Sequence, residues 1–352
     1  MTRTPTTARS IADLVDAGAL PPDAHADAAL AQVARDYAIA VTPEVLDLIE
    51  GTPANDPIAR QFIPTAQETI TTAEERVDPI GDDAHAPVKG IVHRYPDRVL
   101  LKPLHACPVY CRFCFRREQV GPGGDVLDDA GLDAAMDYIA THPEIWEVIV
   151  TGGDPFMLSP RRIARIVNAL DALPHVAVIR FHTRVPIADP RRVNDDLIAA
   201  LRAARAALYV GVHCNHAREL TPDARACLAR LADAGIPLLS QSVLLRGVND
   251  SVEALEALFR ALVSARVRPY YLHHPDLARG TGHFRLSIDE GQALMRALRG
   301  RLSGLCQPTY VLDIPGGYGK SPIGPTYADD AGPDGTRAVV DFRGGQHPYP
   351  NK

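Results

Sequence analysis

The sequence predicts an α/β fold, a partial (β/α)6 barrel with a helical extension before it and a further segment after it. From about residue 99 onward, apolar strand-like runs alternate with amphipathic helical stretches. The runs are continuous in Val, Ile, Leu and Tyr, which is typical of strands that a parallel sheet buries on both faces. Repeated strand–helix units imply right-handed crossovers between parallel strands. A doubly wound open sheet is the competing architecture.

Six core strand–helix units carry this prediction. The strands are expected at residues 99–105, 147–151, 176–183, 208–214, 237–244 and 268–274, with a further one at 309–313. Thr221 and Pro222 open one of the intervening helices, since proline is tolerated in a first helical turn. Asn249 and Asp250 offer an N-cap to another, whose apolar positions 252, 255, 259 and 262 recur on one face.

The first 90 residues have a different pattern. Two helices, expected at 27–40 and 43–50, lead into a stretch rich in proline and aspartate. We expect residues 1–90 to form a helical extension that wraps the barrel rather than an independent domain. Residues 91–285 then form the barrel core, and residues 286–352 form the C-terminal segment.

The composition, with 46% hydrophobic and 23% charged residues, is that of a globular protein. A net charge of −6 gives no basic footprint, so nucleic acid is not expected as a partner. No stretch has the length of a membrane span, and the N-terminus lacks the apolar core of a secretory signal. Six cysteines, three of them clustered, make a poor disulfide framework in 352 residues, so we expect a reducing cytoplasm.

Cys107, Cys111 and Cys114 follow the first core strand, where functional groups collect in parallel α/β folds. Three thiolates can hold three irons of a [4Fe–4S] cube and leave the fourth iron open to a substrate. The alternatives are a zinc site and a redox pair formed by Cys111 and Cys114. Zinc normally takes four ligands, and no second Cys or His pair follows at finger-like spacing. A redox pair would not need Cys107.

Gly152, Gly153 and Asp154 end the second core strand. The two glycines allow a ligand to approach the backbone closely. Such a turn is also a common strand–helix connection, so alone it is a weak signal.

Lys320 lies in the glycine-rich run PGGYGKSP (315–322). A phosphate-binding P-loop would need glycine where Ile314 stands and a helix where two prolines follow. A lysine in such a loop suits covalent attachment of the aldehyde of pyridoxal phosphate (PLP). A solvated lysine in a surface turn is the alternative.

These motifs together resemble the lysine 2,3-aminomutases, PLP-dependent radical S-adenosylmethionine (SAM) enzymes, from about residue 40 onward. The resemblance also covers NDPIARQFIPT (55–65), HRYPDRVL (93–100), QSVLLRGVND (241–250) and the RPYY and GHFR runs within 268–285. It implies a radical SAM barrel in which Cys107, Cys111 and Cys114 hold the [4Fe–4S] cluster and Lys320 is the catalytic, PLP-binding lysine. It places Gly152, Gly153, Asp154, His213 and Gln241 around SAM. Arg94 and Arg98 are the expected PLP-phosphate contacts, although an arginine beside Asp97 can equally form a surface ion pair.

The resemblance also implies an isomerase that converts L-lysine to β-lysine. Arg116 supplies a planar fork for the substrate carboxylate. Asp276 and Asp313 match the carboxylates that hold the side-chain ammonium, whereas a glutamate-specific relative would want cationic or neutral groups there. An electron donor such as flavodoxin or ferredoxin is expected. The alternatives are the related enzyme that makes (R)-β-lysine for elongation factor P, a radical SAM enzyme for another amino acid or without PLP, and a non-catalytic iron–sulfur carrier.

Two departures from the family pattern carry predictions. Ser251 and the cysteine-free C-terminus replace the cysteines that bind a structural zinc at a subunit interface, so we predict no zinc. The family's usual tetramer is therefore not assumed, and a homo-oligomer is left open.

Overall fold

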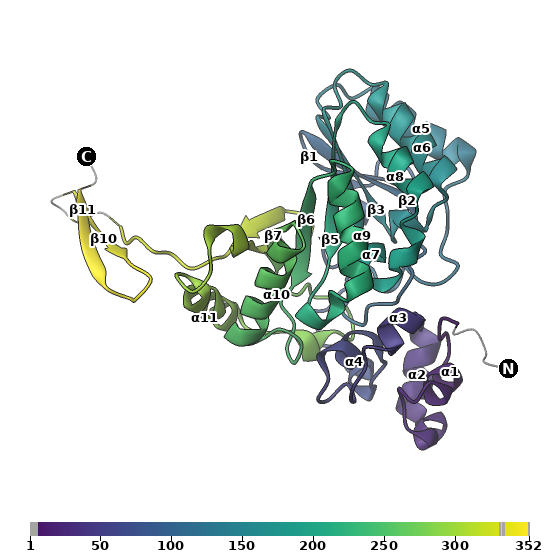
Figure 1. Cartoon of the computed structure of the whole chain (residues 1–352), viewed down its shortest axis with the longest axis horizontal. Coiled ribbons are helices and arrows are strands. Elements are labelled where there is room, and N and C mark those ends of the chain that lie inside the picture. The colour runs from purple at the N-terminus through teal and green to yellow at the C-terminus, as the bar shows by residue number, and fades with distance from the viewer. Residues whose placement is uncertain (1–5, 331, 333–334, 351–352) are drawn as a thin grey trace.

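The structure is a computed structural model that describes residues 6–330, 332 and 335–350. Within these residues, nine strands form one sheet in which each strand lies beside the next one in the chain (Figure 1). The strands are β1 (Ile91–Tyr95), β2 (Arg98–Leu104), β3 (Glu147–Gly152), β4 (Val178–Thr183), β5 (Ala207–His213), β6 (Leu238–Val243), β7 (Val267–His273), β8 (Thr309–Ile314) and β9 (Gly319–Pro322). Strands β2 to β8 run parallel, and β1 and β9 run antiparallel at the two edges. A doubly wound sheet would reverse its strand order, so the predicted barrel is confirmed.

The two edges of the sheet approach each other at Tyr95 and Lys320. The backbone N–H of Lys320, on β9, donates to the hydroxyl of Tyr95, at the end of β1, over 2.6 Å. The barrel is therefore nearly closed, and the strand that carries Lys320 forms part of its wall. The sequence predicted neither edge strand, because both are short, β1 lies between Gly90 and Pro96, and β9 itself contains glycine and proline.

Helices connect most of the parallel strands and lie on the outside of the sheet (Figure 1). They are α5 (Asp129–Ala140), α6 (Pro160–Asp171), α7 (Val185–Ala188), α8 (Asp195–Arg202), α9 (Pro222–Asp233), α10 (Val252–Ser264) and α11 (Ile288–Leu298). Thr221 caps α9 as predicted. The predicted cap of α10 is wrong, because the hydroxyl of Ser251 accepts from the N–H of Ala254, whereas the Asn249 side chain is buried and braces nearby loops. None of the described helices is long and apolar enough to cross a membrane.

The N-terminal extension contains α1 (Ile11–Asp16), α2 (Ala28–Asp36), α3 (Pro43–Leu46) and α4 (Pro57–Phe62). The two predicted helices are therefore shorter than expected. The second ends early at Leu46, and the first ends at Asp36 because Tyr37 is extended and the chain then bridges Val41 to Ala8. We missed α4 in the proline-rich stretch, although Asp56 and Pro57 are an N-cap followed by an N-terminal proline.

The extension has its own apolar cluster, which packs against the barrel through Val109 and Ala188. A larger cluster fills the space between the sheet and its helices. Strands β10 (Thr336–Val340) and β11 (Gln346–Pro350) form a separate hairpin that lies away from the barrel (Figure 1). The division into 1–90, 91–285 and 286–352 stays a prediction, and its residues 1–5, 331, 333–334 and 351–352 lie outside the described residues.

Candidate active site

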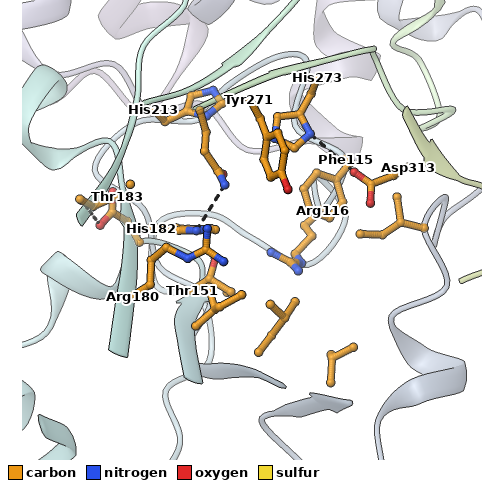
Figure 2. A pocket seen from close by; sticks show the side chains of 18 of the residues that line it. Phe115, Arg116, Thr151, Arg180, His182, Thr183, His213, Tyr271, His273 and Asp313 are labelled. Carbon is orange, nitrogen blue, oxygen red and sulfur yellow. Dashed lines mark hydrogen bonds and ion pairs between the residues drawn. The ribbon is translucent and has the colours of Figure 1, made fainter. Parts of the chain in front are cut away.

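All of the predicted site residues line one cavity of about 530 Å³ inside the barrel. Figure 2 labels Arg116, His213 and Asp313 among them. The shared cavity brings together Cys107, Cys111, Cys114, Gly152, Gly153, Asp154, His213, Gln241, Arg94, Arg98, Arg116, Asp276, Asp313 and Lys320. Small-molecule sites typically enclose about 300–1,000 Å³. Their roles stay predictions, but the fold has assembled them from strands far apart in the sequence.

The cysteine loop, residues 105–118, follows β2 and is held by the N-terminal extension. The N–H of Tyr110 donates to Ala40 O over 2.8 Å, and the N–H of Arg112 donates to Gln61 O over 2.8 Å. The side chains of Arg112 and Arg117 both bond the buried carboxylate of Glu68. The loop is therefore fixed by residues that precede the barrel in sequence.

The three thiols fit an iron–sulfur cube in their position and their chemistry. A turn in which the Cys114 N–H donates to Cys111 O (3.0 Å) keeps two of them on one short segment. Burial raises the pKa of all three thiols, so their thiolates need a cationic partner such as iron. No three His, Cys, Asp or Glu side chains in the described part of the chain converge as a single metal ion requires. A cube does not require this convergence, because each cysteine ligates a different iron.

The turn at 152–154 packs directly against the cysteine loop. The N–H of Gly153 donates to Leu104 O (2.7 Å), and the N–H of Asp154 donates to Ala106 O (2.8 Å). A Cβ on Gly153 would lie 2.3 Å from Ala106 O, so only glycine fits there. Both carboxylate oxygens of Asp154 are occupied by Thr183 and by backbone N–H groups at 156, 184 and 185. Asp154 therefore braces the turn against the end of β4, and the turn offers its backbone to a ligand.

Two half-buried imidazoles, those of His182 and His213, line the cavity at the ends of β4 and β5 (Figure 2). Burial lowers the pKa of both His182 and His213 well below the usual range, so both are neutral at pH 7. Gln241 Nε2 lies 3.3 Å from His182 Nε2. His213 stacks on Phe113 of the cysteine loop at 5.7 Å between ring centroids, and its Nε2 has no partner among the described residues. These groups suit recognition of a polar, heterocyclic ligand.

A buried carboxylate, Asp82, contacts three cations beside the cavity, and two of them, Arg94 and Arg116, line it. Its oxygens lie 3.0 Å from Arg94 Nη2, 3.5 Å from Lys102 Nζ and 2.8 Å from Arg116 Nη2. One carboxylate cannot balance three cations, and the buried Arg94 Nε lacks a partner among the described residues. The excess positive charge favours an anionic ligand group, a phosphate or a carboxylate.

Arg98 has a different environment from Arg94. Its Nη1 lies 2.6 Å from Asp97 Oδ1, and its guanidinium lies over the Tyr95 ring at 3.7 Å. The side chain is one-third exposed. Arg98 therefore forms the ion pair with Asp97 that was its alternative role. It also lines the cavity, so its contact with a PLP phosphate stays a prediction.

Asp313, Lys320, Asp276 and His273 form a second, anionic part of the site. Asp313 on β8 and Lys320 on β9 are direct cross-strand partners, with Lys320 Nζ 2.7 Å from Asp313 Oδ1. Burial opposes ionisation of Asp313, but His273 and Lys320 nevertheless hold its pKa below the usual range. Burial and the nearby Asp313 carboxylate raise the pKa of Asp276 to about 8. Its buried Oδ1 has no partner within the residues described.

Sequence reasoning missed Asp82, Lys102, His182 and Arg184. His182 and Arg184 lie at the end of a predicted strand, the signal that identified the cysteines and the GGD turn. Asp82 lies in the aspartate-rich stretch at 78–83, where no pattern in the sequence distinguishes it from the other aspartates. Its contacts with Arg94 and Arg116 are defined only by the fold.

Comparison with known proteins gives a consistent result. The sequence profile of the Radical SAM superfamily matches residues 101–259. The chain is 41% identical over 298 residues to the L-lysine 2,3-aminomutase of Clostridium subterminale, covering 85% of this chain and 71% of that protein. It is 35% identical to the Glutamate 2,3-aminomutase of Clostridioides difficile (86% and 71% covered) and 35% identical to the L-lysine 2,3-aminomutase of Escherichia coli (82% and 83% covered).

Proposed function

The chain belongs to the lysine 2,3-aminomutase family of radical SAM enzymes, and from this premise we propose that it converts L-lysine to β-lysine. The reaction moves the amino group from C2 to C3 within one molecule, as an intramolecular aminotransferase does. One observation carries the proposal. The three cysteines, Lys320 and the two aspartates of the anionic part line a single cavity.

The residues present fit three cofactors. Cys107, Cys111 and Cys114 would hold the [4Fe–4S] cluster. The 152–154 turn, His213 and Gln241 would hold SAM. Lys320 would hold PLP together with Arg94 and Arg98. When bound, the cluster and SAM supply one-electron chemistry for hydrogen removal, and PLP supplies a conjugated aldehyde for the migrating amine.

The chain's own residues bind and orient the substrate. Asp276 and Asp313 accept from the side-chain ammonium, because two carboxylates offset the desolvation of one buried cation. Arg116 directs its guanidinium into the cavity (Figure 2), where it suits the substrate carboxylate. The neutral imidazoles of His182 and His213 add no charge that would compete with the ammonium for the aspartates. The buried walls exclude water from the reacting carbons.

Glutamate is a second candidate substrate, which a relative's name raises. Its side-chain carboxylate would have to lie beside Asp276 and Asp313, and like charges in a buried site repel. An elongation factor P-type enzyme that makes (R)-β-lysine would bind the same free amino acid. A radical SAM enzyme without PLP would leave Lys320 without a role. Among the described residues, no contact in the cavity favours either of these two enzymes over the proposal.

The remaining expectations belong to the same proposal. A low-potential donor such as ferredoxin or flavodoxin would supply the electron. Six free cysteines suit a reducing cytoplasm. The proposal also includes that the chain binds no structural zinc and acts as a monomer or a homo-oligomer.

The test is anaerobic reconstitution of the full chain with iron, sulfide, PLP and SAM, followed by incubation with single amino acids under reducing conditions. We expect β-lysine from L-lysine and no β-isomer from glutamate or alanine. Conversion of glutamate but not lysine would contradict the roles of Asp276 and Asp313. Isomerisation that survives Lys320→Ala would contradict PLP dependence.

A further inference from the structure

Arg184 is a buried cation that touches one of the cysteines outside the substrate-binding part of the cavity. It follows β4, and its Nη1 donates to Cys111 Sγ over 3.1 Å. Its side chain is only 5% exposed. Cys111 is one of the three proposed cluster ligands, so a full positive charge would lie in contact with the ligand shell of the cluster.

Several buried groups fix this guanidinium in place. Its Nη2 donates to Gln61 Oε1 over 2.8 Å and also bonds Glu219. The ring centroids of Phe62 and Phe113 lie 4.6 and 5.6 Å from the Cζ atom of Arg184. The charge is therefore held in one position by the N-terminal extension, the cysteine loop and the segment after β5.

Hydrogen bonds from other residues hold the Glu219 carboxylate in place. Its Oε1 accepts from the backbone N–H groups of Asn215 (3.0 Å) and His216 (2.8 Å). Gln61 Nε2 also donates to it over 3.2 Å. The Cys111 sulfur thus contacts the Arg184 cation directly, and the compensating carboxylate of Glu219 contacts the guanidinium.

We propose that the Arg184–Glu219 pair sets the reduction potential of the iron–sulfur cluster, with Arg184 acting as a positioning residue for Cys111. This inference rests on the proposed cluster site. Reduction adds one electron from an external low-potential reductant to the cluster, with no bond made or broken in the protein. A hydrogen bond and a fixed positive charge at a ligand sulfur favour the more negative, reduced cluster, and a nearby carboxylate disfavours it.

The proposal predicts shifts of opposite sign from the two partners. Arg184→Gln removes the cation and should lower the midpoint potential. Glu219→Gln removes the anion with little change of shape and should raise it. A tenfold change in the reduction equilibrium, ~59 mV for one electron, is the size we expect for each. Arg184→Lys keeps the charge but loses the fork, so its potential should lie between those of wild type and Arg184→Gln.

The measurement is an anaerobic redox titration of the reconstituted full chain, followed by electron paramagnetic resonance of the reduced cluster. Arg205→Gln is the matched control, because it removes an arginine–aspartate pair before β5, at the other end of the barrel strands. Its potential should equal that of wild type. Should Arg184→Gln retain no cluster, Arg184→Lys and Glu219→Gln carry the test.

Two failures can be told apart. If the wild-type chain takes up no cluster, the proposed function is wrong. If it takes up a cluster whose potential is the same in all variants, or shifts in the same direction for Arg184→Gln and Glu219→Gln, only this inference is overturned.

Discussion

Asp313 and Lys320 face each other across β8 and β9, with Lys320 Nζ 2.7 Å from Asp313 Oδ1. Residues 315–318 join the two strands in a tight turn, which keeps Asp313 and Lys320 paired across the ladder. If Lys320 holds PLP as proposed, its nitrogen would be directed to the cofactor, and Asp313 could accept from the ammonium of a substrate lysine. Cofactor loading and substrate recognition would then be linked through Asp313.

Replacing either aspartate should weaken lysine binding. Asp313→Asn and Asp276→Asn each remove one charged acceptor, and a hydrogen bond to a charged group contributes about 1.5–3 kcal/mol. We therefore expect a Kd for lysine about 10- to 100-fold higher, measured by calorimetry on PLP-loaded protein. PLP absorbance should stay unchanged. The exposed Asp129→Asn is the control, and equal affinity in all four proteins would contradict the assignment.

Lysine binding should release a proton at pH 7. The pKa of Asp276 is raised to about 8 by burial and by Asp313, so most of this carboxyl is protonated at pH 7. An arriving ammonium stabilises the carboxylate, lowers this pKa and expels the proton. Calorimetry in buffers of different ionisation enthalpy measures the release, which should disappear above about pH 9 and in Asp276→Asn. Proton uptake, or release that persists in Asp276→Asn, would contradict this prediction.

Lys320 should be the lysine that PLP modifies. The chain has only four lysines, at positions 89, 102, 320 and 352. Lys102 is buried against Asp82 and does not line the cavity, whereas Lys320 does. Borohydride reduction of PLP-loaded protein, followed by peptide mass spectrometry, should find the pyridoxyl group on the peptide that contains Lys320. Labelling of Lys102 in its place would overturn the PLP assignment.

Gly153→Ala should disrupt the turn at 152–154, the proposed SAM contact. The new methyl group would lie 2.3 Å from Ala106 O, a backbone atom of the cysteine loop that cannot move aside without displacing the loop. We expect at least a tenfold loss of SAM affinity, measured by equilibrium dialysis on the reconstituted protein. Gly304→Ala is the matched control, because its methyl group would meet no atom within 4 Å. Equal SAM affinity in the two variants would show that the turn is not tightly packed.

Glu68→Gln should destabilise the whole chain. It leaves the buried guanidinium groups of Arg112 and Arg117 without their carboxylate, and breaking a buried pair costs about 3–5 kcal/mol. Urea unfolding measures the change. Glu290→Gln breaks an exposed pair with Arg246 and should cost less than about 1 kcal/mol. Similar costs for both variants would mean that the extension does not hold the cysteine loop.

The sequence predicted the parallel barrel because its strands are continuous apolar runs, a signal that depends only on local composition. Motif spacing and family resemblance identified the cysteines, the GGD turn and Lys320 as candidate site residues. Sequence reasoning missed β1, β9 and α4, which are short and contain or adjoin proline or glycine, residues that are typical of loops. Asp82 and Arg184 act through partners far away in sequence, and such partners are defined only when the fold brings them together.

The most direct test of a single shared cavity uses L-lysine deuterated at C3. The reconstituted enzyme is supplied with this substrate, SAM and reductant, and 5′-deoxyadenosine is analysed by mass spectrometry. If the cysteine cluster and Lys320 serve one site, deuterium from lysine appears in the 5′-deoxyadenosine, and none appears with Lys320→Ala. Unlabelled 5′-deoxyadenosine from the wild-type chain would contradict the account.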